Sequence, residues 1–155
     1  MANNTSGKLI ISSPAFQQEG NIPSKYTCDG QEINPAFNIE NIPDDTQTLA
    51  IVAEDPDASK GTFDHWVVWN IPKTGKIAEN STPGVSGKNG TGHTGYHGPC
   101  PPSGSHRYYF YVFALDTKLD LNAGSNKEEL QAAMDEHILA TGTLMGRYQK
   151  IKQNA

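Results

Sequence analysis

Hydrophobic runs separated by Pro, Gly, Asn and Asp predict a protein built mainly from β-strands. The longest run, residues 107–115, is largely aromatic or β-branched and contains no Gly or Pro. This pattern is typical of a strand buried on both faces in the middle of a sheet. Two further runs, 47–54 and 64–71, predict strands on either side of an acidic turn. Residues 8–13 predict a short strand that Pro14 ends.

One segment has the periodicity of an amphipathic helix. Ser125 and Glu128 fit a capping box at its start, and apolar side chains then recur on one face as far as Ile138. The next segment, 144–151, predicts either a second helix or a final strand. The Gly-rich segment 73–95 has the composition of a long, mobile loop, and loops of this length are often functional. These elements together predict the mainly β class, with one or two helices near the C-terminus.

Length, charge and cysteine content narrow the class further. The 155 residues suffice for one core, so we expect a single domain over 1–155, with a flexible stretch at 1–7. The net charge is −5 and no run of Lys or Arg occurs, which argues against a nucleic-acid partner. The chain starts without the apolar segment of a secretory signal and has no run long enough for an integral membrane span, so we expect a cytoplasmic protein. Cys28 and Cys100 allow at most one intramolecular disulfide, and a reducing cytosol would keep both as thiols.

Two segments carry side chains that could form a binding site. Asp55 and Asp57 lie in a tight turn after one predicted strand, and His65 opens the next. His106 and Tyr108 lie where a Pro-rich loop enters the central strand. Imidazole and phenol groups suit a small oxyanion. Because bare carboxylates would repel an anion, we expect both aspartates to hold imidazole protons and to make the histidines more basic.

These side chains also have ordinary structural explanations. The two aspartates of the turn could serve only to cap backbone amides. His65 and His106 could be histidines at the edge of the core, and Tyr108 could be a core residue. Arg107 should point to the opposite face of its strand from its two neighbours, so we expect it to act as a structural ion-pair partner. His97 is close enough to the Pro-rich loop to border the site.

The chain resembles a known family in five segments, which are Ser13-Pro14-Ala15-Phe16, 22–30, Asp55-Pro56-Asp57-Ala58 with His65, Gly98-Pro99-Cys100-Pro101-Pro102 with His106-Arg107-Tyr108, and 144–148. The family is that of the phosphatidylethanolamine-binding proteins, also called Raf kinase inhibitor proteins, and the resemblance is to its bacterial branch. It implies an antiparallel, Greek-key-like β-sandwich with a small anion-binding pocket at one sheet edge. It further implies a cis peptide before Pro56 and a homodimer.

Carried over position by position, the resemblance implies a pocket lined by Asp55, Asp57, His65, Gly98, Pro99, Pro101, Pro102, His106 and Tyr108. The leading hypothesis is a binding protein for phosphate, sulfate, a carboxylate or a phosphorylated head group. It would act without chemistry, through its pocket or by docking a kinase or protease, and we expect no cofactor or metal. The alternative is a hydrolase of phosphoesters or acyl substrates that uses the Asp, His and Tyr side chains. Against this alternative stands the lack of a Ser or Cys nucleophile motif.

Overall fold

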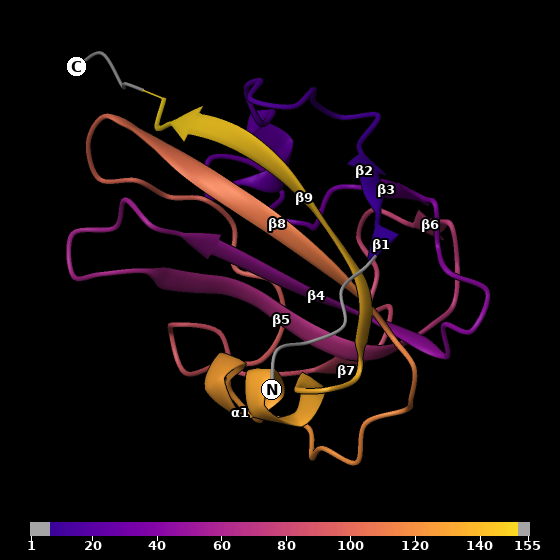
Figure 1. The fold of residues 1–155 in the computed structure, drawn as a ribbon. Helices are drawn as coiled ribbons and strands as arrows, with labels where there is room; N and C mark the ends of the chain where they lie inside the picture. Colours follow the sequence, from indigo (N-terminus) through magenta and orange to yellow (C-terminus); the bar gives the residue numbers. More distant parts are fainter. Residues whose placement is uncertain (1–6, 152–155) are drawn as a thin grey trace.

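The protein, described here by a computed structural model of residues 7–151, packs two β-sheets face to face (Figure 1). The larger sheet has the strand order β1-β9-β8-β4-β5-β7, and the smaller sheet has the order β2-β3-β6. The elements are β1 (Gly7–Lys8), β2 (Ile10–Ser12), the 3-10 helix η1 (Ser24–Tyr26), β3 (Phe37–Glu40), β4 (Thr48–Asp55), β5 (Phe63–Pro72), β6 (Lys76–Ile77), β7 (Val85–Ser86), β8 (Ser105–Leu115), α1 (Lys127–Met134) and β9 (Ile138–Gln149). The predicted mainly β sandwich with a helix near the C-terminus is confirmed.

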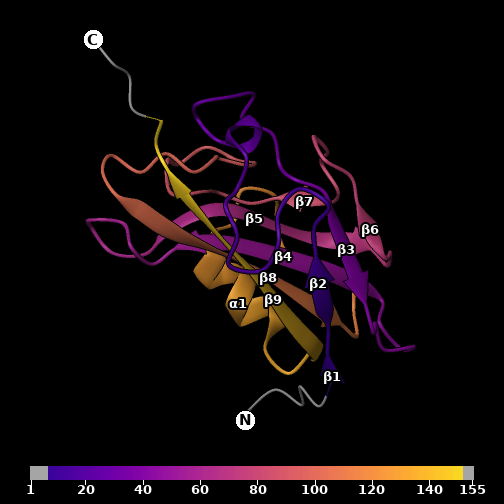
Figure 2. The same ribbon diagram turned by 90° about the horizontal axis from the view of Figure 1, so that it is seen from above.

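The strand β8 forms the middle of the larger sheet, as its hydrophobic run predicts. It is antiparallel to β4 on one side and to β9 on the other. Phe110 and Val112 point into the core between the two sheets, where they join Phe37 and Ile39 of β3. A second core lies on the opposite face of the larger sheet, where Leu130 of α1 packs among side chains of β4 and β5. Figure 2 shows α1 and the smaller sheet on different sides of the larger sheet.

The helix α1 begins one residue later than its sequence predicts. The N-cap is Asn126 rather than Ser125, because the Asn126 side chain accepts a hydrogen bond from the backbone amide of Glu129. The Glu129 carboxylate in turn accepts a hydrogen bond from the backbone amide of Asn126. The Ser125 hydroxyl instead donates to a backbone oxygen of the preceding turn. The helix ends before His137, whose Nδ1 lies 2.8 Å from Asp116 Oδ1.

The last hydrophobic segment is a strand, so α1 is the only α-helix within residues 7–151. Residues 138–149 form β9, which pairs with β8 along its whole length. The pairing of β1 with β9 is parallel, so the larger sheet departs from the wholly antiparallel arrangement that the resemblance implies. No helix in the described part of the chain is long and apolar enough to cross a membrane.

The Gly-rich segment 73–95 contains the strands β6 and β7 rather than an unbroken loop. Its glycines allow close packing: a Cβ atom at Gly90 would lie 2.5 Å from the ring of Phe63. The amide of Gly90 donates to the backbone of Asp64, and that of Gly87 to Val67. Glycine here serves close approach to β5, a role that composition alone does not distinguish from flexibility.

Two further expectations concern the backbone. The bond between Asp55 and Pro56 is trans, so the expected cis peptide is wrong. Of the stretch 1–7 that we expected to be flexible, Gly7 belongs to β1, and the rest lies outside the described residues.

Candidate functional site

A cavity of about 200 Å³ lies at the edge of the larger sheet, where the C-terminal end of β4 meets the N-terminal ends of β5 and β8. These ends meet because β4 is antiparallel to both neighbours, although 51 residues separate Asp55 from His106 along the chain. The cavity is lined by Asp55, Ala58, Ser59, Phe63, His65, His97, Cys100, Pro101, Pro102, His106 and Tyr108.

Asp55 and His106 form a closely paired carboxylate and imidazole in this cavity. Asp55 Oδ2 lies 2.6 Å from His106 Nδ1, and the side chains are 4% and 13% exposed. The second oxygen, Oδ1, accepts the amide of Asp57 at 2.7 Å. Asp55 therefore acts both as a turn former and as the carboxylate that orients His106. Within residues 7–151 the ring nitrogen Nε2 of His106 makes no hydrogen bond, so it can meet a ligand.

Asp57 does not line the cavity, and its carboxylate holds Arg107 instead of an imidazole. Its oxygens accept hydrogen bonds from Nε and Nη2 of Arg107 at 2.9 and 2.8 Å. Oδ2 also accepts a hydrogen bond from the backbone amide of Arg107. These contacts with the guanidinium lower the pKa of Asp57 to about 2. The prediction that Arg107 is a structural ion-pair partner is confirmed, because strand alternation turns it away from His106 and Tyr108.

His65 is buried and makes its hydrogen bond with the backbone. Its Nδ1 lies 2.6 Å from the carbonyl oxygen of His97, so Nδ1 carries the proton and donates. Burial lowers the pKa of His65, which opposes the expectation that the aspartates make both histidines more basic. His65 is thus a neutral imidazole near pH 7, and its Nε2 is a hydrogen-bond acceptor.

The hydroxyl of Tyr108 is buried and has no hydrogen-bond partner among residues 7–151. Burial is the main cause, and the charge of Asp55 the next, of a raised pKa for Tyr108, so the phenol keeps its proton. Asp55 lies close enough to affect this hydroxyl by its charge and as a weak acceptor, but its carboxylate makes no well-formed hydrogen bond with it. The Tyr108 ring packs edge-on against His65, with 5.2 Å between ring centroids. The Tyr108 hydroxyl is therefore a hydrogen-bond donor in the cavity that a bound acceptor could pair.

The wall opposite β8 is the segment 97–102. Gly98 and Pro99 lie behind the cavity rather than in its lining: the Gly98 amide donates to Glu32 Oε2 at 3.1 Å, and Pro99 O accepts the Cys28 amide at 3.1 Å. A Cβ atom at Gly98 would lie 2.7 Å from a backbone oxygen of Tyr26, which explains why this position is Gly. His97 borders the cavity, as expected from its distance to the Pro-rich loop.

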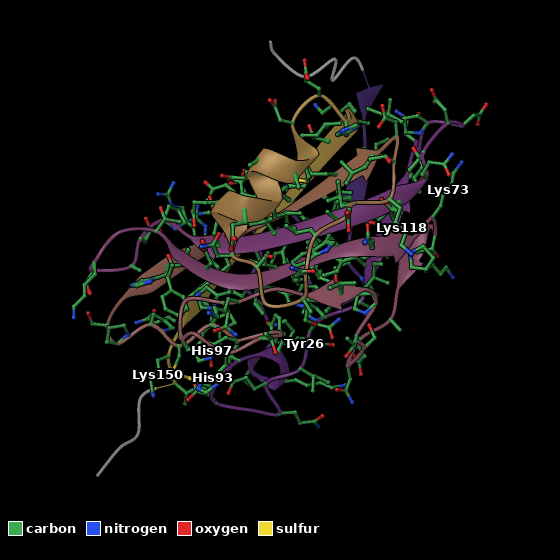
Figure 3. All side chains as sticks on the ribbon, turned by 90° about the horizontal axis from the view of Figure 1, so that it is seen from below. Tyr26, Lys73, His93, His97, Lys118 and Lys150 are labelled. Carbon is green, nitrogen blue, oxygen red and sulfur yellow. A yellow bond between two sulfur atoms is a disulfide. The ribbon has the colours of Figure 1, made fainter. Side chains whose placement is uncertain are left out.

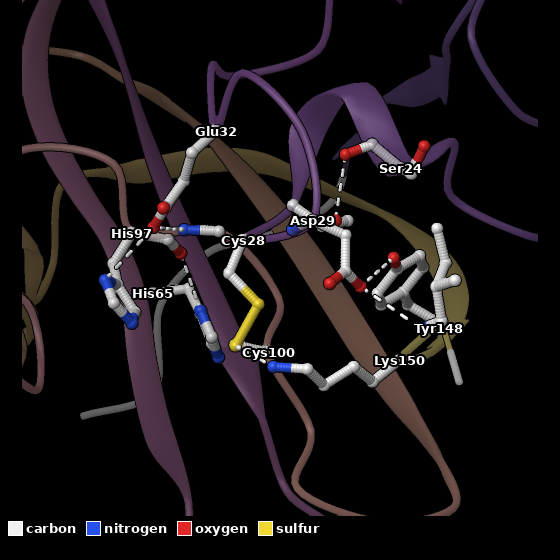
Figure 4. Close-up of a disulfide and its surroundings, with 12 residues drawn as sticks. Ser24, Cys28, Asp29, Glu32, His65, His97, Cys100, Tyr148 and Lys150 are labelled. Atoms are coloured by element: carbon white, nitrogen blue, oxygen red, sulfur yellow. Dashed lines mark hydrogen bonds and ion pairs between the residues drawn. A yellow bond between two sulfur atoms is a disulfide. The ribbon is translucent and has the colours of Figure 1, made fainter. Parts of the chain in front are cut away.

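Cys28 and Cys100 form a disulfide across 72 residues, so the expectation of two free thiols is wrong (Figure 4). The bond joins the segment after η1 to the cavity wall, since Cys100 is itself a lining residue. The sequence allows one disulfide between these cysteines, but we expected free thiols because we expected the protein to lie in a reducing cytosol.

Four lining residues, Ala58, Ser59, Phe63 and Cys100, are not among those proposed from the sequence. Phe63 precedes His65 by two positions in β5, so strand alternation would have placed it on the same face. Its ring contacts His65 at 4.9 Å between centroids. Ser59 follows the acidic turn, and nothing in its sequence context distinguishes it from an ordinary loop serine.

Of the nine residues proposed for the site, the structure gathers Asp55, His65, Pro101, Pro102, His106 and Tyr108 around one cavity. The cavity has polar groups that converge on a small volume at a sheet edge, which is typical of ligand-binding proteins. A β-sandwich with such a recess defines a class of small-ligand binders.

Comparison with known proteins gives the family. The sequence model of the phosphatidylethanolamine-binding protein family matches residues 12–149. A UPF0098 protein from Methanothermobacter thermautotrophicus is 42% identical over 150 residues, covering 92% of this chain and 99% of the relative. A UPF0098 protein from Chlamydia trachomatis is 42% identical over 149 residues, with coverages of 92% and 99%. The chain belongs to the phosphatidylethanolamine-binding protein family and is a ligand-binding protein of that type.

Solved structures agree with this assignment. A crystal structure from Chlamydia trachomatis, described as a phosphatidylethanolamine-binding protein homologue, superposes with a TM-score of 0.89 at 40% identity and covers 94% of this chain and 100% of the other. The Escherichia coli protein YbcL has the same fold, with a TM-score of 0.85 at 24% identity and coverages of 93% and 99%. The relatives come from archaea as well as bacteria, so the similarity is not confined to a bacterial branch.

Proposed function

We propose that the protein binds a small oxyanion, either free phosphate or the phosphate of a larger ligand, and does so without chemistry. The observation that carries this proposal is the buried Tyr108 hydroxyl, a donor without a partner that lines the same cavity as His106. A buried donor left unpaired costs about 1–3 kcal/mol, and a bound acceptor removes that cost.

The donors and acceptors of the cavity match a phosphate that keeps one proton. When His106 is protonated, Asp55 accepts the proton on Nδ1, and Nε2 donates to one anion oxygen. Tyr108 donates to a second oxygen. The neutral His65 offers Nε2 as an acceptor, which suits a P–OH group and not a bare oxygen.

The volume of the cavity supports a small ligand. At about 200 Å³ it is smaller than typical drug-sized sites, which occupy about 300–1,000 Å³. The phosphate of a head group could enter, and the rest of such a ligand would remain outside the cavity.

The test is a calorimetric titration with inorganic phosphate and with phosphoethanolamine at pH 6 and pH 8. We expect saturable binding at pH 6 that weakens at pH 8, the response of an anion that a charged imidazole holds. Tyr108→Phe should weaken binding about tenfold, the effect of one lost hydrogen bond to a charged ligand. The matched control is Tyr111→Phe, which removes a hydroxyl from the same strand outside the cavity. Equal affinities for Tyr108→Phe and the wild type would contradict the proposal.

The alternative function is hydrolysis of phosphoesters or acyl substrates. The pair Asp55–His106 could activate a hydroxyl nucleophile, but Ser59, which lines the cavity, makes no hydrogen bond with any of the three histidines of the cavity within the described residues. This favours binding over catalysis. Turnover of a generic phosphoester that is lost in His106→Ala would support the hydrolase instead.

The expected partners remain predictions. Docking of a kinase or protease, the homodimer and the cytoplasmic location follow from the resemblance and from composition. A pull-down with variants of the segment 73–95 tests the docking, and sedimentation of the purified chain tests the dimer.

A further inference from the structure

We infer that the Cys28–Cys100 disulfide is a redox-active site that reacts with small thiols and thereby controls the position of one wall of the cavity. The inference rests on the proposed function for its ligand readout. Its structural part, the movement of the wall, can be tested without a ligand. Cys100 is exposed and Cys28 is half-buried, so the bond is accessible to a reductant in solution.

The two ends of the disulfide differ in how firmly the chain holds them. Around Cys28, Asp29 accepts hydrogen bonds from the Tyr148 hydroxyl and the Ile151 amide (Figure 4). The Thr27 hydroxyl donates to Ser24 O, and the Gly30 amide donates to Thr27 O. This end is therefore fixed to η1 and to the end of β9 whether or not the disulfide is present.

The Cys100 end has no comparable support. Up to Pro99 the wall is held by the hydrogen bonds to Glu32 and to the Cys28 amide. From residue 100 to residue 104, where β8 is about to begin, no backbone hydrogen bond joins the wall to another described residue. Pro101 and Pro102 have no amide proton to donate. In the described part of the chain, the disulfide and the packing of the buried Pro101 are thus the main tertiary links between residues 100–104 and the rest of the protein.

A nearby cation favours cleavage of the disulfide with Cys100, rather than Cys28, as the leaving thiolate. Lys150 Nζ lies 3.9 Å from Cys100 Sγ, as the close-up shows (Figure 4). An ammonium group next to sulfur stabilises a thiolate and makes it the better leaving group. Cys28, by contrast, is followed by the carboxylate of Asp29, which disfavours a thiolate there.

The reaction is thiol–disulfide exchange with a dithiol. One thiolate of the reductant attacks Cys28 Sγ, a mixed disulfide forms there, and Cys100 leaves as a thiolate beside Lys150. The second thiol of the reductant then displaces Cys28. Two electrons pass to the protein, two protons complete the thiols, and the reductant leaves as its own disulfide. Residues 100–104 are then free to move away from His106 and Tyr108.

The first experiment measures the affinity for inorganic phosphate at pH 6. Oxidised protein, protein reduced by dithiothreitol and the double variant Cys28→Ser/Cys100→Ser are compared. We expect the dissociation constant of the reduced and the double-variant proteins to rise about tenfold, because binding must now order a wall that the disulfide held in place. Reoxidation should restore the wild type and leave the double variant unchanged. Equal affinities of the oxidised and reduced proteins would overturn control of the cavity.

The second experiment needs no ligand and separates the two proposals. Amide hydrogen exchange at residues 105–107, where β8 begins, should accelerate on reduction, while exchange in the middle of β4 stays the same. If no form of the protein binds phosphate, the proposed function fails, and accelerated exchange at 105–107 still supports the inference. Unchanged exchange there would overturn it.

The third experiment tests the role of Lys150. Lys150→Gln should slow reduction by dithiothreitol several-fold under native conditions, as followed by alkylation of the released thiols. The matched control is Lys118→Gln, which removes an exposed positive charge on another side of the molecule (Figure 3). A disulfide that resists dithiothreitol until the protein is denatured, or equal rates for both variants, would contradict a reactive site.

Discussion

Asp55 accepts the Nδ1 proton of His106 at 2.6 Å while its other oxygen accepts the amide of Asp57, so one carboxylate fixes both the turn after β4 and the imidazole of the cavity. Such a carboxylate sets the tautomer and orientation of its imidazole. The way in which His106 faces an anion thus depends on Asp55.

Asp55→Asn should weaken phosphate binding at pH 6 about tenfold, because the amide no longer stabilises a charged imidazole. Titration calorimetry measures the effect, and the His106 ring signals followed by NMR report the state of the ring directly. The control is Asp57→Asn, whose carboxylate lies outside the cavity. If both variants bind phosphate like the wild type, His106 does not supply the charge.

The ion pair of Asp57 and Arg107 should contribute to stability rather than to binding. We expect Asp57→Ala and Arg107→Ala each to lower the free energy of unfolding, with a measurable coupling between them in a double-mutant cycle. The effect should be modest because the side chains are 28% and 42% exposed and water screens their charges. Urea denaturation measures the cycle, and a coupling of zero would contradict a stabilising pair.

The same pair predicts a loss of stability in acid. The pKa of Asp57 falls from an ordinary 3.8 to about 2 in the folded protein, because Arg107 binds the charged form. A lowered carboxyl pKa gives stability that is present above the unfolded value and lost as pH falls through the folded value. The contribution of Asp57 to the free energy of unfolding should therefore disappear between about pH 4 and pH 2. Asp57→Ala should make the free energy of unfolding depend less on pH in this range.

His65 should make the protein less stable in mild acid. Its folded pKa lies below the ordinary 6.5 because the ring is buried. Below that ordinary value the unfolded chain takes up a proton that the folded protein resists, so stability is lost as pH falls from about 7 toward 5. His65→Gln should reduce this slope in thermal denaturation at the two pH values, whereas His93→Gln, in an exposed loop, should leave it unchanged. A slope unaffected by His65→Gln would show that the ring is not held neutral.

The sequence predicted those features that depend on local pattern. The central strand could be predicted because 107–115 has no breaker, and the position of Arg107 follows from strand alternation. The start of α1 was displaced by one residue because Ser125 and Asn126 are both good N-caps, and only tertiary contacts decide between them. Local pattern thus predicts which segments form strands and a helix and which face a side chain takes, but not the residue at which the helix begins.

The remaining features depend on contacts between distant segments. The pKa direction of His65 is set by burial, which a sequence without its fold does not give. The partner of Asp57 lies 50 residues away, and either an imidazole or a guanidinium was compatible with the spacing. The disulfide spans 72 residues, and whether two such cysteines meet is decided by the sandwich as a whole.

The neutral His65 leads to a prediction about which anion is preferred. Its Nδ1 donates to His97 O, so Nε2 is the acceptor nitrogen of a ring that lines the cavity. Near pH 7 phosphate still carries a proton and can donate to that nitrogen, whereas sulfate carries none and would be repelled. We expect phosphate to bind about tenfold or more tightly than sulfate, since a site built for a donor rejects an analogue that lacks it. His65→Gln offers an amide that can rotate to donate, so it should reduce this preference. Competition between the two anions in calorimetry measures the ratio, and equal binding of phosphate and sulfate by the wild type would show that His65 does not act as an acceptor.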